Sequence, residues 1–396
     1  MKAIRPLARI CSLLLALMVS LGASAETPMA ETPSLSEQGL TLGIHSIAYP
    51  QVTGLVDEEL QAAVNAQIID AGAGALLSRL PLVMSGEVPL TLRYDALLEG
   101  GVLSCAMLAS GPVVTDRTTQ VWYTANIDLT TGEPIPLSAL FAVDEDTALD
   151  AIGEWLDFVI APEMSAHLLN SELLPVPQTY SLTPQGVTFH YPIEQLSTLS
   201  GLAGTVTLHW FELPELFDLT EGSILDRIGA ADYMNPGNNA ADAIRACAEA
   251  GALPGIPAAL GQPLSEYVAA YHLLTDPDLY EGGRMFSLED SRFRSCWLLT
   301  DSLSYKTFDE SLVLGIRSDC ISLFGLTTTA DEQPGTPIAT WRTLLGEPDA
   351  TLDVDADLAD LYRITPGTSD YYRFGEYTLR LHAGEDGSLS TVFITY

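Results

Sequence analysis

The chain has 396 residues, of which 52 are acidic and 17 are basic, and its formal net charge is −35 at pH 7. A charge of this size repels nucleic acid and anionic lipid. It favours cationic proteins, cationic peptides or divalent metal, or it serves only to keep an extracellular protein soluble.

The first 25 residues have the pattern of a secretory signal peptide. Basic residues precede an apolar run, Leu13–Leu21, and small residues end the segment at Ala25. No later stretch reaches the ~20 apolar residues of a membrane span. We therefore predict a secreted, extracellular bacterial protein that is cleaved near Ala25 and has no membrane span, with a disordered N-terminal segment over residues 26–39.

Residues 40–228 are predicted to form a first α+β domain. In the helix that Asp57 opens, Leu60, Val64 and Ile68 recur every four residues on one face. The expected elements are a strand over 42–48, this helix, strands near 90–98, 101–108 and 118–129, a helix from about 147, a hairpin over 180–191 that turns at 183–186, and a strand near 205–210.

The stretch YTANIDLTTGEPIPLSALF, Tyr123–Phe141, changes its character within a few residues. It begins with the alternation of a half-buried strand and turns at Thr130-Thr131-Gly132. Ser138 then has the position of a helix N-cap before Ala139. The pattern predicts a strand, a turn and a helix start, and contains no catalytic motif.

Three segments carry a resemblance to a known family: YPQVTGLVDEELQAAVNAQI (Tyr49–Ile68), IDLTTGEPIPLSALF (Ile127–Phe141) and LTPQGVTFHYP (Leu182–Pro192). Their order and spacing resemble a bacterial extracellular domain of unknown general function, found in the lysozyme-sensing anti-sigma factor and next to peptidoglycan deacetylases. The resemblance covers about residues 40–226. It implies an α+β domain that recognises a protein ligand.

A linker rich in Gly, Asn and Ala is predicted over residues 229–245, followed by a second domain over 246–396. There QPLSEYVAAYHLLTDPD (Gln262–Asp278) aligns without gaps with QPGTPIATWRTLLGEPD (Gln333–Asp349). Two copies, about 258–325 and 326–396, should each place a helix on antiparallel strands. The pattern resembles the tandem repeats of the β-lactamase-inhibitor-like fold, which implies partner docking; a merely duplicated structural unit is the alternative.

Known catalytic motifs are missing from the sequence. Lys306 is the only lysine after the signal peptide, and it lacks the context of a P-loop, a Schiff base or a Ser-Lys dyad. There is also no G-x-S-x-G and no H-E-x-x-H motif. We therefore predict a protein that is not an enzyme, with no catalytic residue and no cofactor site.

Two weak metal candidates remain. Asp353, Asp355 and Asp357 imitate the start of a calcium loop, although Leu358 and Ile364 stand where Gly and Glu are needed, and a solvated acidic loop is the alternative. His190 and His209 each face away from the apolar side of their strand. Their imidazoles would be neighbours if the strands pair, but an exposed polar sheet face accounts for them equally.

Four cysteines follow the signal peptide, and an even count in an exported protein permits disulfides. Cys296 and Cys320 flank a predicted hairpin region and are the candidate pair. Buried free thiols are the alternative. Pairing of Cys105 with Cys247 would cross the domain boundary and is not favoured.

These patterns predict a secreted, acidic, non-catalytic binding protein for a cationic or cell-wall-associated protein such as lysozyme. Residues 26–240 carry 4 Arg, no Lys and 28 acids, hence a net charge of −24, which motivates the cationic partner. The alternatives are a cell-envelope hydrolase of peptidoglycan or polysaccharide with an unrecognised carboxylate pair, and an inhibitor of an exported hydrolase. The ligand and the oligomeric state are left open.

Overall fold

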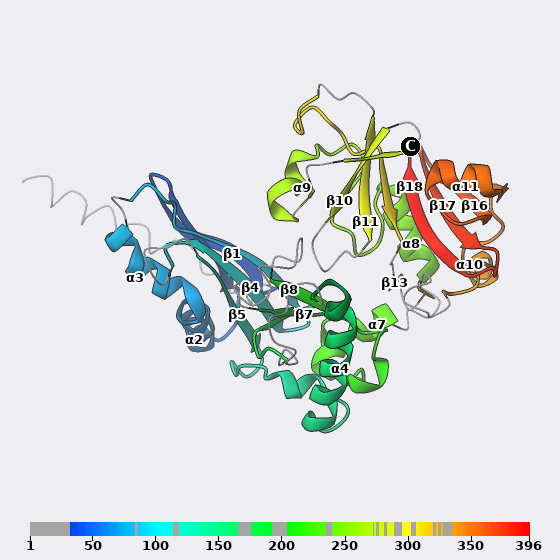
Figure 1. Ribbon diagram of the computed structural model, residues 1–396. Coiled ribbons are helices and arrows are strands. Elements are labelled where there is room, and N and C mark those ends of the chain that lie inside the picture. The colour runs from blue at the N-terminus through cyan, green and yellow to red at the C-terminus, as the bar shows by residue number, and fades with distance from the viewer. Residues whose placement is uncertain are drawn as a thin grey trace, which may run out of the picture.

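The computed structural model contains two units, each with helices and a large sheet, and so confirms the α+β class (Figure 1). Among the described residues, no helix is both long and apolar enough to cross a membrane. The structure describes residues 32–83, 86–113, 119–164, 176–191, 204–234, 240–271, 273–274, 277–280, 283–288, 295–301, 306–319, 322–323, 326–327 and 335–396. The predicted signal peptide lies outside them.

The first unit is built on a five-stranded sheet in the order β1-β2-β3-β4-β5. Neighbouring strands are antiparallel except β2 and β3, which are parallel. A parallel pair needs a crossover connection, and helices provide it here. The strands are β1 (Ser34–Leu42), β2 (His45–Thr53), β3 (Thr91–Glu99), β4 (Val102–Gly111) and β5 (Thr119–Asp128).

The crossover helices cover one face of this sheet. The first helix begins where the sequence predicts: Asp57 is its N-cap and accepts hydrogen bonds from two backbone amides of the first turn. Val64 and Ile68 are fully buried against the sheet. The crossover consists of α2 (Glu58–Ile68), a π-helical turn η1 (Ile69–Ala73) and α3 (Gly74–Val83) (Figure 1).

The N-terminal strand differs from the prediction. Residues 34–39, expected to be disordered, form the first part of β1, and the expected single strand over 42–48 is a hairpin that turns at Gly43. β1 pairs with β2 along its whole length, from Ser34 opposite Thr53 to Leu42 opposite His45. Most of its side chains are exposed. Backbone hydrogen bonds therefore order this strand without the apolar pattern on which the sequence prediction relied.

The turn after β5 forms as predicted. The Asp128 carboxylate accepts hydrogen bonds from the backbone N–H (2.9 Å) and the hydroxyl (2.7 Å) of Thr130. Gly132 has a φ of +76°, which glycine adopts without strain. A 3-10 helix, η2 (Leu137–Leu140), follows. Ser138 lies inside η2 and does not cap it, so this detail of the prediction was wrong.

A three-stranded sheet lies against the other face of the five-stranded sheet, next to β4 and β5. Its hairpin turn falls between Thr183 and Gly186, as predicted. Phe189, Tyr191 and Trp210 are almost completely buried and form the centre of the adjoining core. The elements here are β6 (Tyr180–Thr183), β7 (Gly186–His190), β8 (Thr205–His209), α4 (Glu145–Met164), η3 (Pro214–Leu216), α6 (Ile224–Arg227) and α7 (Ala230–Met234).

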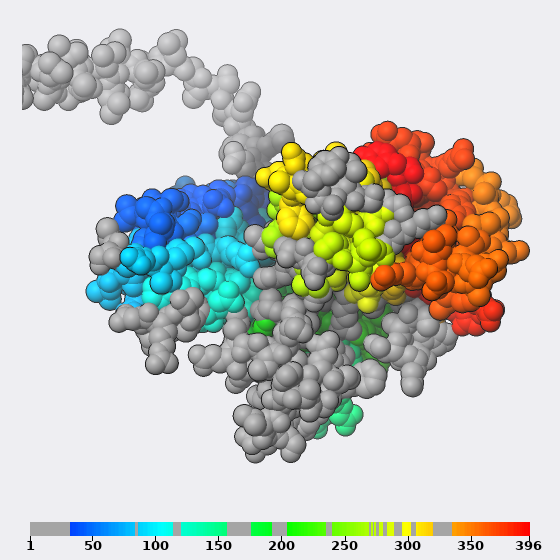
Figure 2. Space-filling view, turned by 45° about the horizontal axis from the view of Figure 1, so that its top comes forward, coloured from blue at the N-terminus to red at the C-terminus, as the bar shows by residue number. Residues whose placement is uncertain are grey.

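The predicted linker, residues 229–245, is largely helical. α7 buries Ala230 and Tyr233 in the first core, and the next helix, α8 (Ala240–Glu249), buries Ile244 in the second core. Residues 235–239 between them lie outside the described residues. The composition was misleading because alanine, which fills many small-residue linkers, is also the strongest helix former. In Figure 2 the atoms of the N-terminal part of the first unit (blue to cyan) and those of the second unit (yellow-green to red) occupy separate parts of the visible face.

The second unit has an eight-stranded sheet in the order β15-β16-β17-β18-β12-β11-β10-β9. Each predicted copy of the repeat contributes four consecutive antiparallel strands, and the two sets join where β12 pairs with β18. The strands are β9 (Asp278–Tyr280), β10 (Gly283–Leu288), β11 (Cys296–Asp301), β12 (Gly315–Ser318), β15 (Ala350–Val354), β16 (Gly367–Phe374), β17 (Tyr377–Gly384) and β18 (Leu389–Thr395); β13 (Ser322–Leu323) and β14 (Leu326–Thr327) form a separate ribbon.

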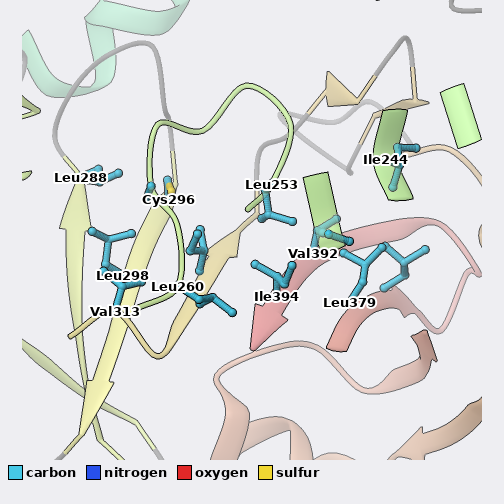
Figure 3. Packing of buried hydrophobic residues seen from close by; sticks show 14 of the residues in the cluster. Ile244, Leu253, Leu260, Leu288, Cys296, Leu298, Val313, Leu379, Val392 and Ile394 are labelled. Carbon is cyan, nitrogen blue, oxygen red and sulfur yellow. The ribbon is translucent and has the colours of Figure 1, made fainter. Parts of the chain in front are cut away.

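Helices cover one face of this sheet and bury a single apolar cluster. Figure 3 shows Leu298 and Leu379, one from each copy, in the same layer as Ile244 of α8. Trp341 and Leu345, from the helix of the second repeat copy, are buried in this cluster. The other helices on this face are α9 (Ser265–Ala270) and α10 (Ile338–Leu345), whereas α11 (Ala356–Tyr362) lies by the opposite face, where Tyr362 packs on Arg380.

The opposite face carries a row of alternating aromatic and arginine side chains. Trp297, Arg317, Phe393, Arg380 and Tyr371 lie directly opposite one another on five neighbouring strands, from β11 to β16. The guanidinium carbons lie 4.9 to 5.5 Å from the centres of the flanking rings. This spacing is that of cation–π contacts. Both arginines are buried, so the row supports the sheet rather than offering free positive charge.

Candidate functional site

A cleft of about 240 Å³ opens between the five-stranded and the three-stranded sheets. β3, β4 and β5 form one wall, and β6, β7, β8 and the turn between β6 and β7 form the other. The lining residues that carry chemistry are Asp95, Ser104, Trp122, Ser181, Gln185 and His190.

Buried hydrogen bonds hold the two walls together. The Ser104 hydroxyl donates to Asn126 Oδ1 (2.6 Å) and accepts from the backbone N–H of Leu182 (2.7 Å). The Asn126 side-chain amide donates to the carbonyl of Tyr180 (2.8 Å). Because buried polar groups are costly when they lack partners, this network fixes β6 over β4 and β5. The walls of the cleft are therefore formed before any ligand arrives.

Trp122 and His190 meet inside the cleft. Their ring centroids are 4.5 Å apart with the planes tilted by 42°. The Ser181 hydroxyl lies 2.9 Å from Nε2 of His190. His190 is buried, whereas Trp122 is only half-buried and keeps part of its surface towards the cleft. The site thus combines an aromatic surface with a hydroxyl group and an imidazole.

The charge of the cleft is confined to its edge. Asp95 is exposed on β3, so its carboxylate reaches solvent where the cleft opens. Of the described residues that line the cleft, Asp95 is the only acid and none is lysine or arginine. Gln185, from the turn between β6 and β7, adds an amide that both donates and accepts hydrogen bonds. The arrangement suits a ligand rich in hydroxyl groups.

The structure separates the two histidines that the sequence singled out. Their strands, β7 and β8, do pair, but His190 is opposite Thr205 and His209 is opposite Gly186, at the two ends of the pair. His209 stacks on Phe211, with ring centroids 5.5 Å apart. The imidazoles are therefore not neighbours, and the weak metal candidate is wrong because pairing alone does not fix register. Both histidines are buried, so the alternative of an exposed polar sheet face is wrong as well.

The acidic candidates Asp353, Asp355 and Asp357 have separate places. Asp353 lies on β15, and Asp355 is the N-cap of α11 and accepts a hydrogen bond from the Leu358 N–H (2.9 Å). Asp357 lies in the first turn of α11, where an acid suits the helix dipole. Across the described ranges, no group of three or more His, Cys, Asp or Glu side chains could hold a metal ion.

The cysteines of the described residues are free thiols. Cys105 and Cys296 are buried, and Cys247 on α8 is partly exposed. Burial raises the pKa of Cys105 to about 12 and raises the pKa of Cys296 as well. Cys320 lies outside the described residues, but Cys296 is a free, buried thiol, so its predicted pairing with Cys320 is not observed.

An acidic stripe runs along the exposed face of α4. Asp146, Asp150 and Glu154 are four residues apart, so they lie one above another on the helix, and all three are exposed. Asp144 precedes the helix and accepts hydrogen bonds from the backbone N–H and the hydroxyl of Thr147, which lower the pKa of its carboxyl. The sequence of α4 contains no basic residue. We call Asp146, Asp150 and Glu154 the α4 stripe.

Comparison with known proteins gives structural neighbours alone. No family model and no curated protein matches the chain. A DUF3298 family member from Bacteroides fragilis is 12% identical, with 50% of this chain and 96% of its own covered and a TM-score of 0.34. A DUF3298 family protein from Pseudomonas aeruginosa is 11% identical, with 47% and 93% covered and a TM-score of 0.32. The DUF4309 family protein YjgB from Bacillus subtilis is 14% identical, with 40% and 97% covered and a TM-score of 0.26.

These neighbours are bacterial domains without an assigned function, and they name no ligand. The link to the lysozyme-sensing anti-sigma factor therefore stays a prediction from the three sequence segments. The cleft could not be located from the sequence, because its chemistry is spread over β3, β5, β6 and β7. Trp122, a large aromatic residue on the polar side of a strand expected to be half-buried, is the one signal that could have pointed to it.

Proposed function

We propose that the protein is a secreted, non-catalytic binding protein that recognises a cationic protein at the cell envelope, with lysozyme as the sharpest candidate. The observation that carries this proposal is the α4 stripe, which lies within residues 26–240, a segment with no lysine and only four arginines. Acids of one sign, without cations interspersed, raise the local concentration of a cationic partner and steer its approach.

The stripe has an energetic cost that plain solubility does not require. Like charges four residues apart destabilise a helix by about 0.2–0.5 kcal/mol per pair. The helix dipole offsets part of this at Asp146 in the first turn, but α4 has no basic residue to do so for Asp150 and Glu154. The same number of acids scattered over loops would keep the protein equally soluble. Concentrating them on one helix face therefore favours recognition.

A hydrolase is less well supported. Glycoside hydrolysis needs two carboxylates about 5–10 Å apart, and Asp95 is the only acid among the described residues of the inter-sheet cleft. A second cavity, of about 430 Å³ in the second unit, is lined by Asp353 and Glu385. Both are exposed, without the contrasting surroundings that make one carboxyl an acid and the other a base.

The test is calorimetric titration of the mature protein with a cationic lysozyme at physiological salt. A variant with Asp146→Asn, Asp150→Asn and Glu154→Gln should bind about tenfold more weakly, because three exposed ion pairs at roughly 0.5 kcal/mol each amount to about 1.5 kcal/mol. Asp353→Asn with Asp357→Asn and Glu376→Gln removes the same charge from exposed sites of the second unit and should have little effect.

Equal weakening by both triple variants would mean that only net charge matters, and the proposal would fail. Binding that disappears at high salt would lead to the same conclusion, since a shaped interface retains part of its affinity when exposed charges are screened. The lysozyme activity of each mixture should be measured as well. Loss of that activity upon binding through the second unit would favour the inhibitor alternative.

A further inference from the structure

We propose that the cleft between the two sheets binds a sugar ring that bears no anionic substituent. This site lies on β3 to β8 and uses none of the α4 stripe, so it does not rest on the protein partner proposed above. The inference follows from the lining residues, their charge and the size of the cleft.

The lining has the two kinds of surface that a sugar ring presents. The C–H groups of a pyranose pack on an aromatic ring, and the half-buried Trp122 offers one, held in place by His190 at 4.5 Å. The hydroxyl groups need donors and acceptors together. Ser181, Gln185 and Asp95 supply hydroxyl, amide and carboxylate oxygens on the surrounding walls.

The charge of the lining excludes acidic ligands. Phosphate and carboxylate ligands are usually held by Arg or Lys, and no described residue of the lining is either. Asp95 would repel an anion, and the charge of −24 on residues 26–240 adds to this repulsion. A neutral or amino sugar meets no such barrier.

The size of the cleft sets the length of the ligand. A volume of about 240 Å³ is below the range of roughly 300–1,000 Å³ found for drug-sized ligands. It suits a single sugar ring. The ring could belong to a free sugar or to the end of a polysaccharide, and these two sources present the same chemistry to the cleft.

The preformed walls favour binding without rearrangement. The hydrogen bonds among Ser104, Asn126 and Tyr180 are internal to the walls, so a ligand need not break them. Affinity for one ring should still be weak, about millimolar, because so few atoms are buried.

The first experiment uses the intrinsic tryptophan fluorescence of the mature protein. Titration with N-acetylglucosamine and with its β-1,4-linked trimer should change the emission, and Trp122→Phe should abolish most of the change. Phenylalanine keeps an aromatic surface, so the calorimetric dissociation constant should stay within about threefold. Trp155→Phe is the matched control, because Trp155 lies in the same unit and donates to Glu212 outside the cleft.

The second experiment tests the role of Asp95 at the opening of the cleft. Asp95→Asn should weaken binding by about tenfold, since a hydrogen bond to a charged group is stronger than one to a neutral group. Glu99→Gln is its control, because Glu99 is exposed on the same strand but does not line the cleft. Glucuronate should not bind to the wild-type protein, because Asp95 would repel it. A trimer that binds more tightly than the single sugar identifies a polymer as the source, and equal affinity identifies a free sugar.

Three outcomes would overturn the proposal. Calorimetry could detect neither sugar at roughly 10 mM, ten times the expected dissociation constant. Trp122→Phe could retain the full fluorescence change, which would place the sugar elsewhere. Arginine amide could bind in the cleft while both sugars fail, which would make the cleft a site for a basic side chain instead.

Discussion

The substitution Asp128→Asn is the sharpest test of how the first unit is held together. Arg227 of α6 donates from Nη1 and Nη2 to the two carboxylate oxygens of Asp128, each at 2.8 Å. The same guanidinium donates to the carbonyls of Gly100 and Gly101, each at 2.9 Å. One residue thus joins the end of β5, the turn between β3 and β4, and α6. Asparagine keeps the shape but places an NH₂ group against the guanidinium.

The expected loss of stability in Asp128→Asn lies between the values for buried and for exposed ion pairs. Breaking a buried ion pair costs about 3–5 kcal/mol, whereas exposed pairs contribute about 0–1 kcal/mol. The side chains of Asp128 and Arg227 are 18% and 21% exposed, so neither limit applies. Asparagine can still accept the hydrogen bonds of Thr130 with its remaining oxygen. We therefore expect Asp128→Asn to lower the free energy of unfolding by about 2–3 kcal/mol at pH 7.

The effect should depend on pH. The hydrogen bonds from Arg227, assisted by those from Thr130, hold the pKa of Asp128 well below its usual range despite the opposing effect of burial. A carboxyl with a lowered folded-state pKa stabilises the protein fully above its unfolded pKa of ~3.9, and this stability is lost as the pH falls below that value. The difference in free energy of unfolding between the wild type and Asp128→Asn should therefore be largest at pH 7 and should become smaller below about pH 4.

The assay is urea unfolding at several pH values, with hydrogen exchange of the peptide from residues 99 to 132 as a local readout. Asp218→Asn is the matched control, because Asp218 accepts the same two hydrogen bonds from Thr220 and has no ion pair with any described residue. It should cost less than about 1 kcal/mol. If Asp128→Asn costs no more than this control, or if its cost does not change with pH, the ion pair does not stabilise the unit and the reasoning is refuted.

Three further predictions concern other contacts. Burial, assisted by the charges of Arg380 and Arg317, lowers the pKa of His382 to about 4. The free energy of unfolding of the wild type should therefore fall as the pH drops from 6.5 to 4, and urea titrations should show a smaller fall for His382→Gln. Gly100→Ala would place a Cβ 1.9 Å from the Arg227 carbonyl oxygen and should destabilise far more than Gly43→Ala, which meets nothing within 4 Å; melting temperatures compare the two. Arg380→Met should cost about 2 kcal/mol in urea unfolding, with only partial rescue by Arg380→Lys, since the planar guanidinium packs on the rings of its neighbours.

Local features were predictable from the sequence because neighbouring residues determine them. Asp57 opens α2 through contacts within its own first turn. Thr183 and Gly186 close the β6–β7 hairpin through hydrogen bonds across three residues. The repeat also predicted that each copy places a helix on antiparallel strands, and the eight-stranded sheet confirms this. In contrast, β1 is mostly exposed and is held by its pairing with β2 alone. Its sequence therefore has no apolar alternation from which the strand could be predicted.

Features that depend on the register between strands could not be predicted from the sequence. The row from Trp297 to Tyr371 exists because β12 of one copy pairs with β18 of the other, which places Arg317 opposite Phe393. The cleft likewise needs β6 to cross β4 and β5. Each of its residues has an ordinary local explanation: Trp122 is one polar-side residue of a strand, and His190 is one residue of a hairpin. Their chemistry appears only when both lie on facing walls.

The use of positive charge within the fold sharpens the functional argument. Several cations pair with acids of their own chain: Arg227 with Asp128, Lys306 with Asp301, Arg317 with Asp319 and Arg342 with Asp370. Such cations are engaged within the fold and are not offered to a partner.

The two proposed sites can be distinguished by the dependence of their binding on salt concentration. Binding at the α4 stripe draws on exposed charges and should weaken as salt shortens their range from ~8 Å at physiological ionic strength to ~3 Å at 1 M. Binding of a neutral sugar beside Trp122 relies on packing and short hydrogen bonds, and should hardly change over the same range. A salt series with both ligands on one protein sample would therefore show whether the first unit has two independent sites, because a single shared site would give two parallel salt dependences.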